Sequence, residues 1–228
     1  MDTPHVWLID LAEDRGGVAS LDAVERTRAA RFADPRARDR WTRAHVALRQ
    51  ILGLYLDIDA ARVTMERGKF GKPRLVQRDA IALPITFSLT HAEDRALLAV
   101  GCGAPLGVDM ERVRPFTEMD AVIAAQCSEG ERAELAVLDP TERVAGFYRC
   151  WTRKEAVLKA LGVGLSAPLV TLAVETAITH RPRVYSTPAG QPSPAAWALL
   201  DLLPGDDYVG ALASVGTLSS VSQLRWAT

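Results

Sequence analysis

The sequence predicts a mixed α+β protein in which each half contains both helices and strands. Two observations predict this class. Apolar residues recur at three- and four-residue spacing in some stretches and in alternating or short continuous runs in others, which is typical of helices and of strands respectively. Both patterns occur in each half of the 228-residue chain, so we expect two halves of similar size, residues 1–106 and residues 107–228.

Four stretches have the apolar spacing of helices, and the last of them carries clear boundary signals. They are residues 20–32, 36–56, 118–138 and 140–161. Asp139 is placed to cap the last stretch, Pro140 occupies a favoured first helical position, and Gly162 can end the helix. These boundaries fix which side chains of the last helix share a face.

Strands are indicated by short apolar runs between turn residues. The expected strands are residues 5–11, 85–91, 96–103, 106–113, 169–175, 182–186, 197–202 and 208–214. The strands expected at residues 85–91, 96–103 and 106–113 follow one another through short turns, which predicts an antiparallel meander. The preceding segment, GKFGKPRL at residues 68–75, is predicted as a turn because its glycines and proline break regular structure.

Composition argues against several classes of protein. A formal net charge of −1 is atypical of nucleic-acid binders, which carry a basic excess to neutralise phosphates. No apolar run reaches the roughly 18 residues that a membrane span needs, and the first residues lack a signal core, so we expect a cytoplasmic protein with no membrane partner. Cys102, Cys127 and Cys150 form neither a disulfide framework nor a zinc pattern, which favours buried thiols.

Two carboxylates, Asp109 and Glu111, lie two residues apart in a predicted strand. Alternate side chains of a strand point to the same face, so both carboxylates face one side while Val108 and Met110 face the other. Mg²⁺ binds to one or two protein carboxylates together with waters and phosphate oxygens, and this arrangement suits it. The alternative is a solvated strand end whose acids pair with neighbouring arginines.

Glu155 falls on the apolar face of the helix predicted at residues 140–161. At about 100° per residue, this face consists of Val144, Phe147, Tyr148, Trp151 and Leu158. A carboxylate there is neutralised, paired or bound to metal, because an unpaired buried charge is costly. Lys159, one turn along, forms either an exposed pair with Glu155 or a contact to a metal-bound phosphate. Three carboxylates and a lysine together describe a phosphoryl-transfer site.

His91 ends the predicted strand 85–91, beside Thr90. An isolated histidine is usually a structural hydrogen-bond partner, but one at a strand end beside Lys72 could also bind a phosphate. Adjacent antiparallel strands could bring His91 near Asp109, so both alternatives stay open.

Several motifs make the chain similar to a known family. LGVDMERVRP resembles the G-(I/V)-D-x-E motif of the surfactin-synthetase-activating type of 4′-phosphopantetheinyl transferase, and FYRCWTRKEAVLKALGVGL resembles the W-(S/T)-x-K-E-(A/S)-x-x-K-x-x-G-x-G-L motif of that family. Upstream, KFGKPRL is similar to the family's G-K-P segment, FSLTHA to its F-(N/S)-(I/L)-(S/T)-H-(S/T) segment and ERTRAARF to its basic N-terminal helix. The resemblance covers nearly the whole chain, and the motifs in this order are highly specific.

The resemblance implies a metal-dependent site. It implies that Asp109, Glu111 and Glu155 coordinate Mg²⁺, which Mn²⁺ could replace, at the pyrophosphate of coenzyme A. It further implies that Lys159 contacts phosphate and aids the departure of 3′,5′-ADP. Glu131 matches a glutamate proposed in the family as the base that activates the carrier serine, but Ser128 and Glu131 also form a capping box for the helix that follows. For Glu131 both roles stay open.

The same resemblance assigns residues to the coenzyme A nucleotide. Lys72, Thr90 and His91 would contact it, with His91 and Arg28 near the 3′-phosphate. Arg40 would assist there. The arginines of the basic helix near the N-terminus cannot be ranked among themselves, because relatives often have lysine and the spacing is loose.

The resemblance implies an α+β fold of two similar subdomains related by a pseudo-twofold axis, with coenzyme A in the cleft between them. The implied activity is Mg²⁺-dependent transfer of phosphopantetheine from coenzyme A to a serine of an apo acyl or peptidyl carrier protein, by a monomer. The carrier could serve fatty-acid, polyketide or non-ribosomal peptide synthesis. The alternatives are a catalytically silent carrier-binding or coenzyme A-binding module of the same fold, and a related metal-dependent phosphotransferase with another acceptor.

Overall fold

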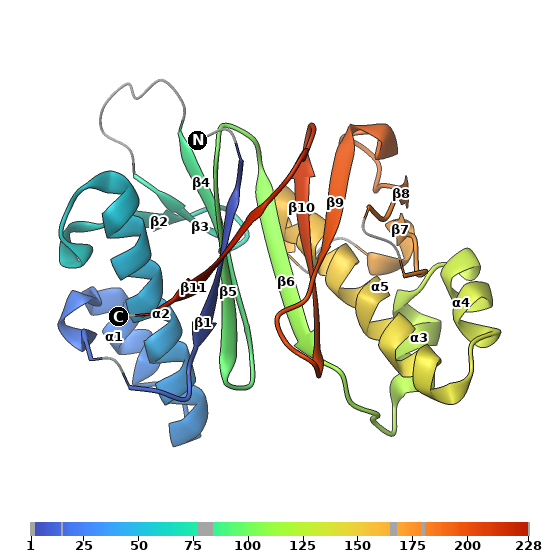
Figure 1. Cartoon of the computed structure of the whole chain (residues 1–228), viewed down its shortest axis with the longest axis horizontal. Helices are drawn as coiled ribbons and strands as arrows, with labels where there is room; N and C mark the ends of the chain where they lie inside the picture. The colour runs from blue at the N-terminus through green and yellow to red at the C-terminus, as the bar shows by residue number, and fades with distance from the viewer. Residues whose placement is uncertain (1–2, 15, 77–83, 165–167, 179–180, 228) are drawn as a thin grey trace.

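The computed structural model describes residues 3–14, 16–76, 84–164, 168–178 and 181–227. The chain forms four layers in the order helix, sheet, sheet, helix (Figure 1). The predicted mixed α+β class is confirmed. Leu165, the last residue of the longest motif, and His180 lie outside the described residues.

The first sheet belongs mainly to the first half of the chain. Its strands, in spatial order, are β11 (Ser222–Trp226), β1 (His5–Asp10), β5 (Arg95–Cys102) and β4 (Ile85–Ala92). β1 runs parallel to β11 and antiparallel to β5, and β4 pairs antiparallel with β5. Helix α2 (Pro35–Leu56) covers one face of this sheet, where Leu48, Ile51 and Leu52 are fully buried.

The second sheet and the long helix α5 (Pro140–Leu161) form the other side of the molecule (Figure 1). The strands are β6 (Leu106–Arg112), β10 (Tyr208–Val215) and β9 (Trp197–Leu202), all antiparallel to their neighbours. α5 packs on this sheet, with α3 (Met119–Gln126) and α4 (Glu129–Ala136) beside it. Asp139 caps α5 and Gly162 ends it with φ 68°, as the sequence predicts.

A third core fills the space between the two sheets. Leu97 and Ala99 of β5 meet Val108 and Met110 of β6 there, and all four are buried. This core confirms that Val108 and Met110 face away from the acids of the same strand.

Gly107 allows β6 to lie unusually close to α5. A Cβ atom at this position would be 2.0 Å from the carbonyl oxygen of Ala156 and 2.4 Å from the nitrogen of Ala160. Such distances are far below van der Waals contact, so only glycine fits without displacing the helix. The glycine of the G-V-D-x-E motif therefore sets the distance between the strand of Asp109 and the helix of Glu155.

Short elements complete the fold. They are α1 (Ala23–Ala29), β2 (Met65–Arg67), β3 (Pro73–Leu75), β7 (Ala173–Val174), β8 (Val184–Ser186) and the 3₁₀ turns η1 (Val18–Ser20), η2 (Ala60–Arg62), η4 (Leu169–Thr171) and η5 (Pro194–Ala196). The predicted turn at residues 68–75 is the tip and second strand of the β2–β3 hairpin, in which Gly71 has φ 86°. The predicted strand 169–175 is mostly the turn η4, with two residues in β7.

The predicted three-stranded meander is wrong in its third strand. β4 and β5 form the expected hairpin, but β6 pairs with β10. Both edges of β5 are already occupied, by β1 and β4, so β6 has no edge of β5 to pair with. Strand β11 is absent from the sequence-based prediction.

Two further expectations concern the membrane and the cysteines. Among the described residues, no helix combines the length and the apolarity needed to cross a bilayer. All three cysteines are free; Cys127 and Cys150 are buried and Cys102 is partly exposed. The buried-thiol interpretation is thus confirmed for two of them.

Candidate active site

Three acidic side chains converge from β6 and α5. Asp109 is only 4% exposed, and Glu111 and Glu155 are partly buried. Burial, the charge of Asp109 and that of Glu155 raise the pKa of Glu111 to about 7, although Lys159 opposes the shift. Burial and the charge of Asp109 also raise the pKa of Glu155. The carboxylates therefore repel one another, and a cation between them would relieve that repulsion.

Asp109 is held on one oxygen and unpartnered on the other. Its Oδ1 accepts hydrogen bonds from Lys159 Nζ at 2.6 Å and from Thr90 Oγ1 at 3.0 Å. Within the described part of the chain, its Oδ2 is buried with no hydrogen-bond partner, and so is Oε1 of Glu155. Buried carboxylate oxygens normally accept hydrogen bonds, so two without a donor in one site are suited to bind a cation.

The carboxylate oxygens of Asp109, Glu111 and Glu155 do not all lie within 4.8 Å of one another. The only metal-ligand-type cluster found among the described residues, with ligand atoms within 4.8 Å of one another, is Cys127, Glu131 and Cys150. Lys154 Nζ lies 2.5 Å from Glu131 in that cluster and already supplies its positive charge. Asp109, Glu111 and Glu155 offer hard oxygen donors, two of them unpartnered among the described residues, whereas the other cluster offers two thiols. The three acids therefore suit Mg²⁺ better.

The apolar face predicted for α5 is confirmed, because all five of its residues belong to the core of the second half or pack against it. Trp151, Glu155 and Lys159 form a partly exposed line along the helix, whereas Arg153 and Lys154 are buried. Glu155 therefore lies at the partly exposed edge of this face, one turn from Trp151 and from Lys159. This position explains how Glu155 can be partly desolvated and still reach a ligand.

A cleft with a cavity of about 650 Å³ lies between the two halves and reaches Lys159. Its basic lining residues are Arg28, Arg67, Lys72, His91 and Lys159, and its aromatic ones are Phe32, Trp41, His45, Phe70 and Phe87. Lys72 Nζ donates to Leu106 O at 2.7 Å and so links the β2–β3 hairpin to β6. Burial and the charge of Lys159 lower the pKa of Lys72 to about 8.

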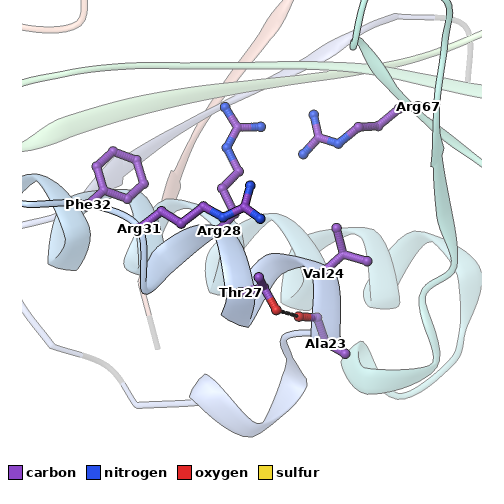
Figure 2. Close-up of a pocket in the computed structure, with 7 residues that line it drawn as sticks. All are labelled: Ala23, Val24, Thr27, Arg28, Arg31, Phe32 and Arg67. Atoms are coloured by element: carbon purple, nitrogen blue, oxygen red, sulfur yellow. Dashed lines mark hydrogen bonds between the residues drawn. The ribbon is translucent and has the colours of Figure 1, made fainter.

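An adjoining hollow of about 790 Å³ is lined by side chains of α1, of the two residues Arg31 and Phe32 beyond it and of β2, and the described lining residues include no acid (Figure 2). Its lining residues are Ala23, Val24, Thr27, Arg28, Arg31, Phe32 and Arg67. In Figure 2 the guanidinium groups of Arg28 and Arg67 approach the same space from opposite sides, with Arg31 beside Arg28. Three guanidinium groups without an acidic partner in the lining suit an anionic ligand.

Three residues predicted to contact a nucleotide have different settings. His91 lines the cleft at its exposed rim, where local desolvation, Lys159 and Arg40 lower its pKa. Arg40 is outside the cleft lining and forms ion pairs with Asp94 at 2.8 Å and Glu93 at 3.1 Å. Thr90 is buried, and its hydroxyl contacts Asp109 and Lys159.

Glu131 is engaged inside the second half on both carboxylate oxygens. Its Oε2 accepts from Ser128 N at 2.7 Å and pairs with Lys154, and its Oε1 accepts from Val174 N at 2.8 Å. The side chain of Ser128 in turn accepts from Glu131 N, so the predicted capping box of α4 is confirmed. A base needs a free oxygen facing substrate, and at 2% exposure Glu131 offers none.

Sequence reasoning missed most of the aromatic lining of the cleft. Trp41 falls within the helix predicted at residues 36–56, and in the structure it stacks on His45 at 3.7 Å between ring centroids and lies under Arg28. Phe70 is adjacent to the G-K-P segment, which is the one local signal that could have indicated it. Arg67 and Ser88 also line the cleft, and nothing in the local sequence pattern around them indicates it.

Comparison with known proteins finds relatives along most of the chain. The model of the 4′-phosphopantetheinyl transferase superfamily matches residues 105–213. The 4′-phosphopantetheinyl transferase HetI of Nostoc sp. is 33% identical over 219 residues, which cover 94% of this chain and 89% of that protein. A 4′-phosphopantetheinyl transferase of Bacillus subtilis is 27% identical over 175 residues, covering 76% and 73%. The 4′-phosphopantetheinyl transferase AcpT of Salmonella typhimurium is 35% identical over 98 residues, covering 43% and 49%.

Proposed function

The chain belongs to the 4′-phosphopantetheinyl transferase superfamily, and we propose that it transfers 4′-phosphopantetheine from coenzyme A to a serine of an apo acyl or peptidyl carrier protein in a Mg²⁺-dependent reaction. The products are the holo carrier and 3′,5′-ADP. One observation supports this most: in the described part of the chain, Asp109 Oδ2 and Glu155 Oε1 are buried without partners, and Lys159, which pairs with Asp109, lines the cleft.

Asp109, Glu111 and Glu155 would hold the Mg²⁺ ion. Their oxygen donors suit it, and their mutual repulsion, expressed in the raised pKa values of Glu111 and Glu155, favours a bound cation. The chemistry that Mg²⁺ supplies when bound is neutralisation of charge on the pyrophosphate oxygens.

The basic residues of the cleft would bind and orient coenzyme A. Lys159 and Lys72 face the pyrophosphate, where Lys159 stabilises the charge of the departing nucleotide. Arg28 and His91, with the neighbouring arginines of the hollow in Figure 2, bind the 3′-phosphate. Arg40 supports this region indirectly, because its ion pairs hold the turn that follows His91.

The carrier serine has to lose a proton as its oxygen attacks the β-phosphorus in line. Glu131 has no free oxygen for this step, and the unpartnered Oε1 of Glu155 is assigned to the metal, so we assign the proton to no residue of the chain. Both halves of one chain line the cleft, so we propose that a monomer is active. We leave the carrier open among those of fatty-acid, polyketide and non-ribosomal peptide synthesis.

The test is mass spectrometry of an apo carrier after incubation with the protein, coenzyme A and Mg²⁺. We expect a mass gain of one phosphopantetheine group, abolished by a chelator and by Glu155→Gln. Glu142→Gln changes an exposed acid of the same helix and serves as the matched control. Normal carrier modification by Glu155→Gln would refute the role of Glu155, and no mass gain on carriers of any class would favour a silent binding module.

A further inference from the structure

Strands β4 and β6 lie side by side where the two sheets meet, and side-chain hydroxyls of β4 form hydrogen bonds with β6 and with the turn that precedes it. Thr86, Ser88 and Thr90 alternate along β4, so they share one face of the strand. The three hydrogen bonds join Thr86 Oγ1 to Ala104 O (3.0 Å), Ser88 Oγ to Val108 N (3.1 Å) and Thr90 Oγ1 to Asp109 Oδ1 (3.0 Å). The first two hold backbone, and the third holds the carboxylate of Asp109.

Thr90 forms a closed triangle with Asp109 and Lys159. Its hydroxyl donates its one hydrogen to Asp109 Oδ1 and accepts from Lys159 Nζ at 3.0 Å, while Lys159 Nζ also donates to Asp109 Oδ1 at 2.6 Å. Both donors meet at the same carboxylate oxygen. The other oxygen, Oδ2, has no hydrogen-bond partner among the residues that the structure describes.

The burial of this triangle makes its geometry rigid. Thr90 is 7% exposed and Asp109 4% exposed, so water does not readily replace a missing bond. Thr90 is also β-branched, which restricts its χ1 angle and fixes the direction of its hydroxyl. The side chain contributes nothing to the lining of the cleft. A direct contact with the nucleotide therefore has less support than a role acting through Asp109 and Lys159.

We propose that Thr90 is a positioning residue, which fixes Asp109 Oδ1 and the ammonium of Lys159 so that Asp109 Oδ2 is presented to the metal. This inference rests on the proposed function. It reassigns Thr90 from nucleotide binding to orientation of a metal ligand, and it assigns to β4, in the first half of the chain, the task of orienting acids in the second half. A hydroxyl at this position is required and a methyl group cannot replace it.

The test compares two threonine-to-valine changes on one face of one strand. Thr90→Val removes the hydroxyl from the triangle, Thr86→Val removes a hydroxyl that contacts only backbone, and Thr90→Ser restores the hydroxyl. Binding of Mn²⁺ to the substrate-free protein is followed by electron paramagnetic resonance, and kcat and KM for coenzyme A are measured separately. Thermal unfolding reports the loss of stability that each change causes.

Thr90→Val is expected to weaken Mn²⁺ binding and to lower kcat by about 10- to 100-fold, the usual effect of removing a residue that orients a metal ligand. KM for coenzyme A should change less than kcat, because the other basic residues of the cleft keep their positions. Thr86→Val and Thr90→Ser should bind Mn²⁺ like the unaltered protein. If Thr90→Val keeps normal Mn²⁺ affinity, or raises KM alone, the positioning role is wrong. If the unaltered protein binds no Mn²⁺, the metal assignment itself is refuted, and the role of Thr90 falls with it.

Discussion

At the scale of single residues, the acids of the site predict how pH and cations affect stability. The pKa of Glu111 is raised from its ordinary value of 4.5 to about 7, so between these values the folded protein holds a proton that the unfolded chain has released. Without a cation, the free energy of unfolding should therefore decrease as the pH rises through this range. Metal binding requires ionised ligands, so Mg²⁺ should raise the melting temperature more at about pH 8 than at about pH 6.

Glu111→Gln is the control for this prediction. It should flatten the pH dependence and reduce the shift with Mg²⁺, because the amide neither titrates nor adds charge. Thermal unfolding at both pH values, with and without Mg²⁺, measures both effects. An equal Mg²⁺ shift at the two pH values would contradict the assignment of Glu111 as a ligand.

Residue-level prediction from the sequence succeeded where it depended on local periodicity. Asp109 and Glu111 share a face because strands alternate, and the opposite face lies in the core as expected. Glu131 could not be resolved in this way. Its partners Lys154 and Val174 are 23 and 43 positions away, and nothing local indicates that they meet it.

At the scale of elements, the contact between β6 and α5 predicts that Gly107 is indispensable. Gly107→Ala would place Cβ 2.0 Å from Ala156 O, so β6 and α5 must separate. We expect a loss of about 3 kcal/mol or more in the free energy of unfolding, at the upper end of overpacking effects. The separation also moves Asp109 away from Glu155, so Mn²⁺ affinity should fall together with stability. Urea unfolding and Mn²⁺ titration measure the two quantities.

Gly130→Ala provides the matched control for Gly107→Ala. Gly130 lies in α4 with open space around its Cβ position, so alanine should be neutral or stabilise by up to about 1 kcal/mol. Gly107→Ala with the stability of the unaltered protein would show that α5 can shift without cost.

The bounds of the long helices were predictable because their caps are local. Asp139 and Gly162 mark the ends of α5 within a residue or two, and the pattern of apolar residues does the same for α2. The pairing of β6 was not predictable, because its partner β10 lies about a hundred residues further along the chain. Periodicity identifies a strand but contains no information about which edge it joins.

At the scale of the whole molecule, β11 complicates the predicted division at residue 106. This strand follows the second half in sequence but pairs in parallel with β1, in the sheet of the first half. The chain thus crosses between the halves twice, and the division into residues 1–106 and 107–228 stays a prediction. The cleft in which we propose that coenzyme A binds is lined from both sides, so its integrity depends on how the halves are joined.

Removal of residues 222–228 tests how strongly β11 stabilises the molecule. The deletion uncovers one edge of β1 and removes Trp226, which packs edge-on against Trp7 with ring centroids 5.9 Å apart. Trp226 is partly buried against the core, and the pairing of β11 with β1 is lost as well, so we expect the free energy of unfolding to fall by about 3 kcal/mol. Gln223→Ala, on an exposed position of the same strand, should change it by less than about 0.5 kcal/mol. The proposed metal ligands lie on β6 and α5, and β11 belongs to the other sheet. Mn²⁺ affinity at low temperature should therefore survive the deletion. An unchanged unfolding midpoint would mean that β11 does not stabilise the first sheet. A loss of Mn²⁺ binding would mean that the whole first sheet, and not β4 alone, orients the acids.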